Sequence, residues 1–185
     1  MRVGVLAVGQ VRSEYLRATA HGVMQVFPHT TCEVIDRVLP VPGQAYDKKR
    51  RQSNSTQILQ NIRVFAANLP YDRVLGITDA DLFASELNYV FGEAYVSGKV
   101  GLISLWRLKP DFYGEEPDRG ALELRMIKEA THELGHTLGL QHCTRSYCVM
   151  HFSQSIFEVD KKQSLFCDQC YLNVSIAISN MGQSS

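Results

Sequence analysis

The twelve residues HELGHTLGLQHC, at positions 132 to 143, restrict the fold of this 185-residue chain more than any other segment. His132 and His136 are four residues apart, so on a helix both imidazoles leave the same face and can bind one metal ion. Gly139 permits the backbone to reverse, and the reversal lets His142 return as a third nitrogen donor. The fold must therefore contain a helix that ends near Gly139 with one face toward a cleft.

The helix that carries these histidines is predicted to run from about Gly120 to Leu138, with Asp118 as its N-cap. Leu134 lies roughly 200° around the helix from His132, so the apolar side is expected to face the core while the histidines face the cleft. The predicted buried stripe has an i, i+3, i+7, i+10, i+14 pattern: Leu124, Ile127, Thr131, Leu134 and Leu138.

Three histidine ligands leave the fourth position of a tetrahedral zinc ion open, which is typical of catalytic zinc. Zinc lowers the pKa of its bound water from about 15.7 toward about 7, and Glu133 can accept the proton as hydroxide attacks a carbonyl. Glu133 can then protonate the leaving amine. The full pattern H-E-x-x-H-x-x-G-x-x-H is more specific than H-E-x-x-H alone and predicts a zinc-dependent metallopeptidase.

Two other functions use the same residues. The first is a non-catalytic module that binds peptides or proteins, although such a scaffold has no physical need for Glu133. The second is a zinc hydrolase that acts on a non-peptide amide.

Met150 follows His142 by eight residues. A lone methionine is usually core filler, but after this motif it indicates the Met-turn, in which a methionine packs beneath the metal site. Phe152 stands where some proteins with this motif place a tyrosine ligand, so that ligand is not expected here. His151 is interpreted as structural because three nitrogen donors are already present.

Four of the five cysteines form two pairs in the last third of the chain, C-x4-C and C-x2-C, separated by 18 residues: Cys143, Cys148, Cys167 and Cys170. Such pairs can form a closed four-thiolate zinc site. A redox-active CDQC pair is the alternative, and the nearby first pair favours zinc. Binding of structural zinc supplies on the order of 10 to 16 kcal/mol, enough to fold the turn-rich segment 143–170.

His142 and Cys143 are adjacent, yet they are predicted to serve two different metals. Neighbouring side chains of an extended segment point to opposite sides, so one backbone step can supply the last ligand of the catalytic zinc and the first ligand of the structural zinc. The sequence therefore predicts two zinc ions per chain.

The rest of the chain predicts one α/β domain over 1–185. It would consist of an N-terminal α/β part, 1–139, that includes the active-site helix, and a C-terminal part, 140–185, with the Met-turn and the four-cysteine site. Segment 41–56 is expected to be a loop. Strands are predicted at 2–9, 32–39, 73–79, 87–96 and 98–108, the last two as a hairpin, and further helices at 13–27, 56–69 and 169–181.

Lysine plus arginine and aspartate plus glutamate each number 19, so the formal net charge is zero. The balance argues against nucleic acid or a membrane surface as a partner, and the KKRR run at 48–51 is interpreted as a solvated loop. We expect a cytoplasmic monomer because the sequence shows neither a signal peptide nor a membrane span. Cys32 is interpreted as structural, and Tyr113 and Arg145 are open candidates for stabilising an oxyanion.

The segment HELGHTLGLQHCTRSYCVM, followed by CDQC, resembles the archaemetzincin family, as do AYDKKRRQSNSTQIL and DADLFASELNYVFGEA. The resemblance covers most of the chain. It implies a metzincin-like zincin fold, with a twisted mixed β-sheet, an active-site helix and a small zinc-stapled C-terminal subdomain. It also implies the three histidine ligands, Glu133 as the base, a four-cysteine second zinc, and an edge strand at 100–107 that pairs with an extended peptide. It does not specify the peptide or protein substrate.

Overall fold

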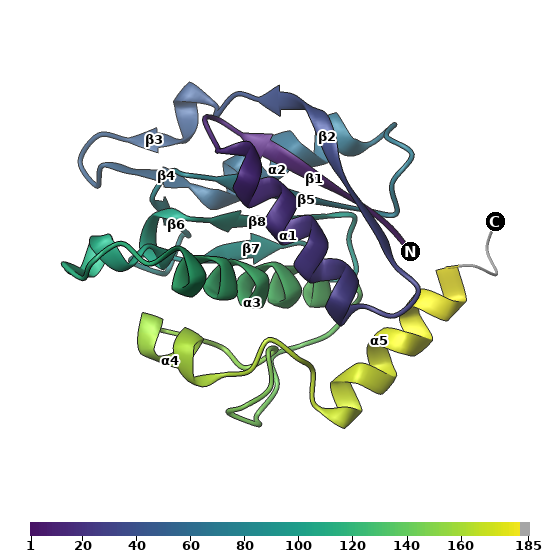
Figure 1. The fold of residues 1–185 in the computed structure, drawn as a ribbon. Coiled ribbons are helices and arrows are strands. Elements are labelled where there is room, and N and C mark those ends of the chain that lie inside the picture. Colours follow the sequence, from purple (N-terminus) through teal and green to yellow (C-terminus); the bar gives the residue numbers. More distant parts are fainter. Residues whose placement is uncertain (182–185) are drawn as a thin grey trace.

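The computed structural model describes residues 1–181 and contains a five-stranded mixed sheet (Figure 1). Four strands are parallel and one edge strand is antiparallel, which confirms the predicted mixed α/β class. The order across the sheet is β2 (Thr31–Leu39), β1 (Arg2–Val8), β5 (Arg73–Thr78), β8 (Val100–Ser104) and β7 (Gly92–Ala94).

Helices cover both faces of this sheet (Figure 1). Alternate residues of β1 enter different cores, as expected for a strand buried on both faces: Val5 packs with α1 (Ser13–Val26) and α3 (Arg119–Thr137), and Leu6 with α2 (Ser55–Ala66). The first core also includes buried residues from the C-terminal segment, among them Val149, Val159 and Val174.

Short elements complete the chain. A three-stranded sheet is formed by β3 (Tyr46–Asp47), β4 (Gln52–Asn54) and β6 (Leu82–Phe83), and the KKRR run is an exposed turn between the first two. The 3-10 turns are Gly43–Ala45, Trp106–Leu108 and Pro110–Tyr113, and the C-terminal helices are α4 (Ile156–Lys161) and α5 (Asp168–Met181). No helix within residues 1–181 is both long enough and apolar enough to cross a membrane.

Helix α4 was not predicted, although the sequence contains a signal for it. Ser155 and Glu158 form a capping box, and the Ser155 amide donates to the Glu158 carboxylate at 3.2 Å. The S-x-x-E spacing could have identified this helix start.

The predicted edge strand at 100–107 is wrong. The hairpin prediction is confirmed, but its first strand, β7, folds outside β8 and becomes the edge, so β8 lies between β5 and β7. The predicted strand 87–96 shortens to Gly92–Ala94 because Phe91 turns into the core and the Val90 amide donates to the Leu82 carbonyl, outside the main sheet.

Helix α3 begins at the predicted cap, since the Asp118 carboxylate accepts a hydrogen bond from the Ala121 amide at 3.0 Å. The prediction that Leu124 belongs to the buried stripe is wrong, because this side chain is 48% exposed. The buried row instead recurs at every fourth residue. It starts two residues before Leu124, at a position about 200° around the helix from that side chain. Its members are Leu122, Met126, Ala130, Leu134 and Leu138.

Candidate metal centres

The three histidines of the motif converge at the end of α3. His132 and His136 extend from the last turns of the helix, and their Nε2 atoms are 3.0 Å apart. His142 joins them from the returning chain, and one ring nitrogen of each histidine lies within 4.8 Å of the other two. Zinc–nitrogen bonds of about 2.0 Å with tetrahedral angles place ligand nitrogens about 3.3 Å apart, so the cluster fits a zinc ion.

Backbone carbonyls orient the two helical histidines. Nδ1 of His132 lies 2.8 Å from the Val149 carbonyl oxygen, and Nδ1 of His136 lies 2.8 Å from the Leu140 carbonyl oxygen. An Nδ1–H that donates to a carbonyl leaves the lone pair on Nε2, which is the metal-binding form. Burial lowers the pKa of both rings, and the Lys162 ammonium contributes in the same direction, which favours the neutral imidazole.

The glycine after α3 returns the chain toward the helix, as predicted. Gly139 has a φ of +93°, in the left-handed region, and its amide donates to the His136 carbonyl at 2.9 Å. The Leu140 amide donates to the Gly135 carbonyl at 3.1 Å, which closes the helix end. This turn places His142 beside the other two imidazoles.

Glu133 is buried between α3 and the β7–β8 hairpin. A Cβ atom built on Gly92 would lie 2.6 Å from Oε1 of Glu133, so a side chain at position 92 would occupy the space of the carboxylate. Burial raises the pKa of Glu133 well above its usual value, and the charge of Glu129 raises it further. A carboxyl group with a raised pKa beside a metal site is suited to accept and release a proton.

The histidines and Glu133 line a cleft of about 630 Å³. One wall consists of residues 87–94, which include the edge strand β7, and the other includes Phe152 and Gln154. Two further charged residues, Glu129 and Lys162, also line the cleft. Sequence reasoning missed both, because an isolated glutamate and an isolated lysine carry no motif.

Met150 packs beneath the end of α3. Its side chain is fully buried, and a Cβ atom at Gly135 would overlap its sulfur. The glycine between the two helical histidines therefore lets the methionine approach the helix backbone.

The four cysteines of the C-terminal segment also converge, with all sulfur atoms within 4.8 Å of one another. The sulfurs of Cys143 and Cys167 are 3.9 Å apart. Zinc–sulfur bonds of about 2.3 Å place tetrahedral ligands about 3.8 Å apart, so this cluster fits a four-thiolate site. His142 and Cys143 thus belong to separate clusters.

In this second cluster, hydrogen bonds to sulfur favour the thiolate form of Cys167, whereas burial raises the pKa of Cys148 and of Cys170. The Cys167 amide donates to the sulfur of Cys148 at 3.3 Å, and the Arg145 guanidinium donates to the sulfur of Cys167 at 3.4 Å. Burial raises the pKa of Cys167, but a bond from the Cys170 backbone and neighbouring thiols outweigh burial and lower it to about 7. The interpretation of Arg145 as an oxyanion-stabilising residue is therefore not supported.

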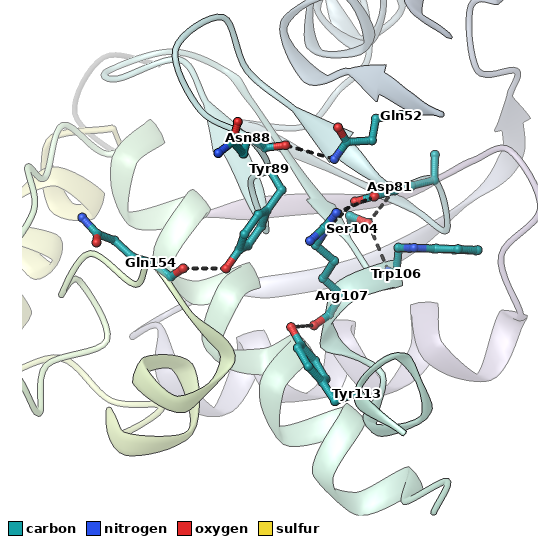
Figure 2. Close-up of polar contacts among 10 residues, drawn as sticks. Gln52, Asp81, Asn88, Tyr89, Ser104, Trp106, Arg107, Tyr113 and Gln154 are labelled. Carbon is teal, nitrogen blue, oxygen red and sulfur yellow. Dashed lines mark hydrogen bonds and ion pairs between the residues drawn. The ribbon is translucent and has the colours of Figure 1, made fainter. Parts of the chain in front are cut away.

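Tyr113 is the other candidate for stabilising an oxyanion, and its hydroxyl group also has a different hydrogen-bond partner. Figure 2 shows that its hydroxyl donates to the carbonyl of Arg107, at 2.9 Å. The Arg107 side chain forms two hydrogen bonds with Asp81 and lies 4.3 Å from the ring centre of Tyr89. The hydroxyl of Tyr89 donates to the Gln154 carbonyl at 2.5 Å, across the cleft (Figure 2).

His151 and Cys32 have structural contacts, in line with the sequence interpretation. Nδ1 of His151 lies 3.0 Å from the Cys143 carbonyl oxygen. Cys32 packs against the first core, and burial together with the charge of Glu33 raises its pKa to about 12.

Known proteins are similar to this chain in sequence and in fold. The family model described as Peptidase family M54 matches residues 21–175. An archaemetzincin from Methanocaldococcus jannaschii is 44% identical over 170 residues, which cover 92% of this chain and 90% of that protein. The crystal structure of an archaemetzincin from Methanopyrus kandleri has a TM-score of 0.85 at 34% identity and covers 97% of this chain and 96% of that one. The crystal structure of a zinc-dependent peptidase from Methanocorpusculum labreanum has a TM-score of 0.84 at 27% identity and covers 93% of this chain and 99% of that one.

Proposed function

Because the chain belongs to Peptidase family M54, the archaemetzincins, a family of zinc metallopeptidases, we propose that it hydrolyses peptide bonds in the histidine-lined cleft. The observation that supports this proposal is the convergence of three imidazoles, two of them oriented by backbone carbonyls, beside the buried carboxyl of Glu133. His132, His136 and His142 would hold a catalytic zinc ion.

Bound zinc would polarise the substrate carbonyl and activate water. Glu133 would accept a proton from the attacking water and transfer it to the nitrogen of the leaving amine. The slot beside Gly92 holds the carboxyl group on the cleft side of α3. Strand β7 has a free edge along the same cleft, and we infer that an extended substrate pairs there as an additional strand.

We further propose a second, structural zinc held by Cys143, Cys148, Cys167 and Cys170. Four thiolates leave no position open for substrate, so this site would not take part in catalysis. Its role would be to hold the segment after His142 in place. Met150, which packs under α3, would act as the Met-turn methionine below the catalytic site.

The test is digestion of a peptide library by the zinc-loaded protein, with and without a chelator. Wild-type protein is expected to contain two zinc ions per chain and to cleave peptides. Glu133→Gln is expected to keep both ions and lose cleavage. Glu123→Gln, a substitution of a half-buried glutamate on the same helix outside the cleft, is the matched control and should cleave normally.

If Glu133→Gln cleaved peptides at the wild-type rate, Glu133 would not be the general base. Silence of fully zinc-loaded wild-type protein on all peptides would favour a binding module or a hydrolase of other amides. A single zinc per chain would contradict the two-site arrangement.

A further inference from the structure

The side chain of Glu93 connects edge strand β7 to helix α2, and the proposed mechanism does not use this residue. Glu93 lies between Gly92, which faces Glu133 on α3, and Ala94. Neighbouring side chains of a strand point to opposite faces, so Glu93 extends toward α2 on the other side of the sheet. Strand β7 has three residues and pairs with β8 alone, so few backbone hydrogen bonds fix its position.

Two hydroxyl groups in the first turn of α2 bind the Glu93 carboxylate. The Thr56 hydroxyl oxygen lies 2.9 Å from Oε1 and 3.1 Å from Oε2 of Glu93. The hydroxyl of Ser55, whose side chain is fully buried, donates to Oε2. The N-terminal end of a helix carries a partial positive charge, which also stabilises a carboxylate. The start of α2 therefore holds Glu93 in a defined position.

The hydrogen bonds to β8 indicate which backbone groups of β7 are free. The Phe91 carbonyl accepts a hydrogen bond from β8 at 2.8 Å, and the Tyr95 amide donates to β8 at 3.2 Å. In an antiparallel ladder every second residue bonds to the partner strand, so Glu93 also directs its amide and carbonyl at β8. The amides and carbonyls of Gly92 and Ala94 therefore point to the open edge, and both residues line the cleft.

We propose that Glu93 is a positioning residue that orients the free backbone groups of β7 for pairing with the substrate. The inference rests on the proposed peptidase function and on the pairing of an extended substrate along β7. The free groups belong to Gly92 and Ala94, the two neighbours of Glu93, so a rotation of β7 about its axis would misdirect all of them. The hydrogen bonds from α2 to Glu93 oppose that rotation.

A purely structural role for Glu93 has a different consequence. If the contact with α2 only stabilised the fold, its loss would lower the free energy of unfolding and leave the ligand affinities of the folded protein unchanged. If the contact orients the edge, its loss weakens ligands that pair with β7 and spares ligands that contact only the metal. Two ligands of different length therefore separate the two roles.

The test uses two hydroxamates, which bind zinc, in calorimetric titrations of the zinc-loaded protein that require no turnover. Acetohydroxamate is too small to pair with β7, whereas an alanine tripeptide hydroxamate extends along the edge. Wild-type protein should bind the tripeptide probe more tightly. Glu93→Ala should weaken the tripeptide probe by about tenfold, roughly the loss of one hydrogen bond, and change the affinity for acetohydroxamate by less than about twofold.

Three further variants complete the test. Thr56→Val removes an exposed hydroxyl donor but keeps Glu93, so it serves as the test if Glu93→Ala fails to fold. It should weaken only the tripeptide probe, by at least about twofold. Glu93→Gln keeps a side-chain acceptor of the same length and should restore part of the affinity that Glu93→Ala loses. Glu86→Ala removes an exposed glutamate outside the cleft and should bind both probes as wild-type protein does.

Wild-type affinity of Glu93→Ala or of Thr56→Val for the tripeptide probe would refute the positioning role and leave the peptidase function intact. An equal loss of affinity for both probes would also refute it, because the change would then lie at the metal site. If wild-type protein bound the two probes equally, pairing along β7 would be wrong, and the role of Glu93 with it. If zinc-loaded wild-type protein bound neither probe, the open metal site of the proposed function would itself be wrong.

Discussion

Substitution of Gly92 by alanine tests whether the edge strand sets the position of Glu133. The added Cβ would lie 2.6 Å from Oε1 of Glu133 and 2.7 Å from the Leu102 carbonyl oxygen. Both distances are shorter than real Cβ contacts, so either the carboxylate or the hairpin must move. Overpacking of this kind costs about 1 to 3 kcal/mol. For a chain of this size, that corresponds to a melting temperature lower by about 2 to 12 °C.

Gly101 provides the matched control on the neighbouring strand. A Cβ at Gly101 would lie 3.3 Å from the Cβ of Glu133 and 3.5 Å from Leu75, contacts that need only a small adjustment. Thermal unfolding of the zinc-loaded proteins should therefore show a smaller loss for Gly101→Ala than for Gly92→Ala. If the carboxylate moves by about 1 Å, the turnover of Gly92→Ala should fall by about 100-fold.

A double-mutant cycle isolates the contact with the carboxylate. Glu133→Ala removes the side chain that Gly92→Ala would meet but keeps the Leu102 carbonyl. The cost of Gly92→Ala should therefore be smaller by at least about 0.5 kcal/mol in the Glu133→Ala background. An identical cost in both backgrounds would refute the idea that Gly92 makes room for Glu133.

Three further changes have defined outcomes. Cys143→Ser should reduce zinc from two ions to one per chain and speed hydrogen exchange in segment 140–181; two retained ions would exclude Cys143 as a ligand. Gly135→Ala, which would overlap Met150, should lower the free energy of unfolding by about 1 to 3 kcal/mol in denaturant titrations, and wild-type stability would contradict the packing. Asp118→Ala removes the cap of α3 and should cost about 1 kcal/mol by the same measurement, without a change in zinc content.

Local sequence signals predicted the elements around the metal centres well. Asp118 and Gly139 mark the two ends of α3 because capping and chain reversal depend on side chains and backbone angles within a few residues. The spacings of the histidines and of the two cysteine pairs predicted two separate clusters. The exposed position of Leu124 was not predictable in this way. Stripes with i+3 and i+4 spacing share some residues, and only the packing shows which of the two stripes is buried.

By itself, the sequence predicted the members of the histidine and cysteine clusters, the helix that carries two of the histidines and the mixed α/β class, since each follows from residue spacing along the chain. Only the tertiary structure decided that β7 is the edge strand, that Gly92 faces Glu133, and that Lys162 meets Glu129 inside the cleft. The last two contacts join residues more than 30 positions apart along the sequence. The periodicity of a segment predicts which face of its own helix or strand a residue occupies. Which other segment packs against that face depends on how the whole chain folds.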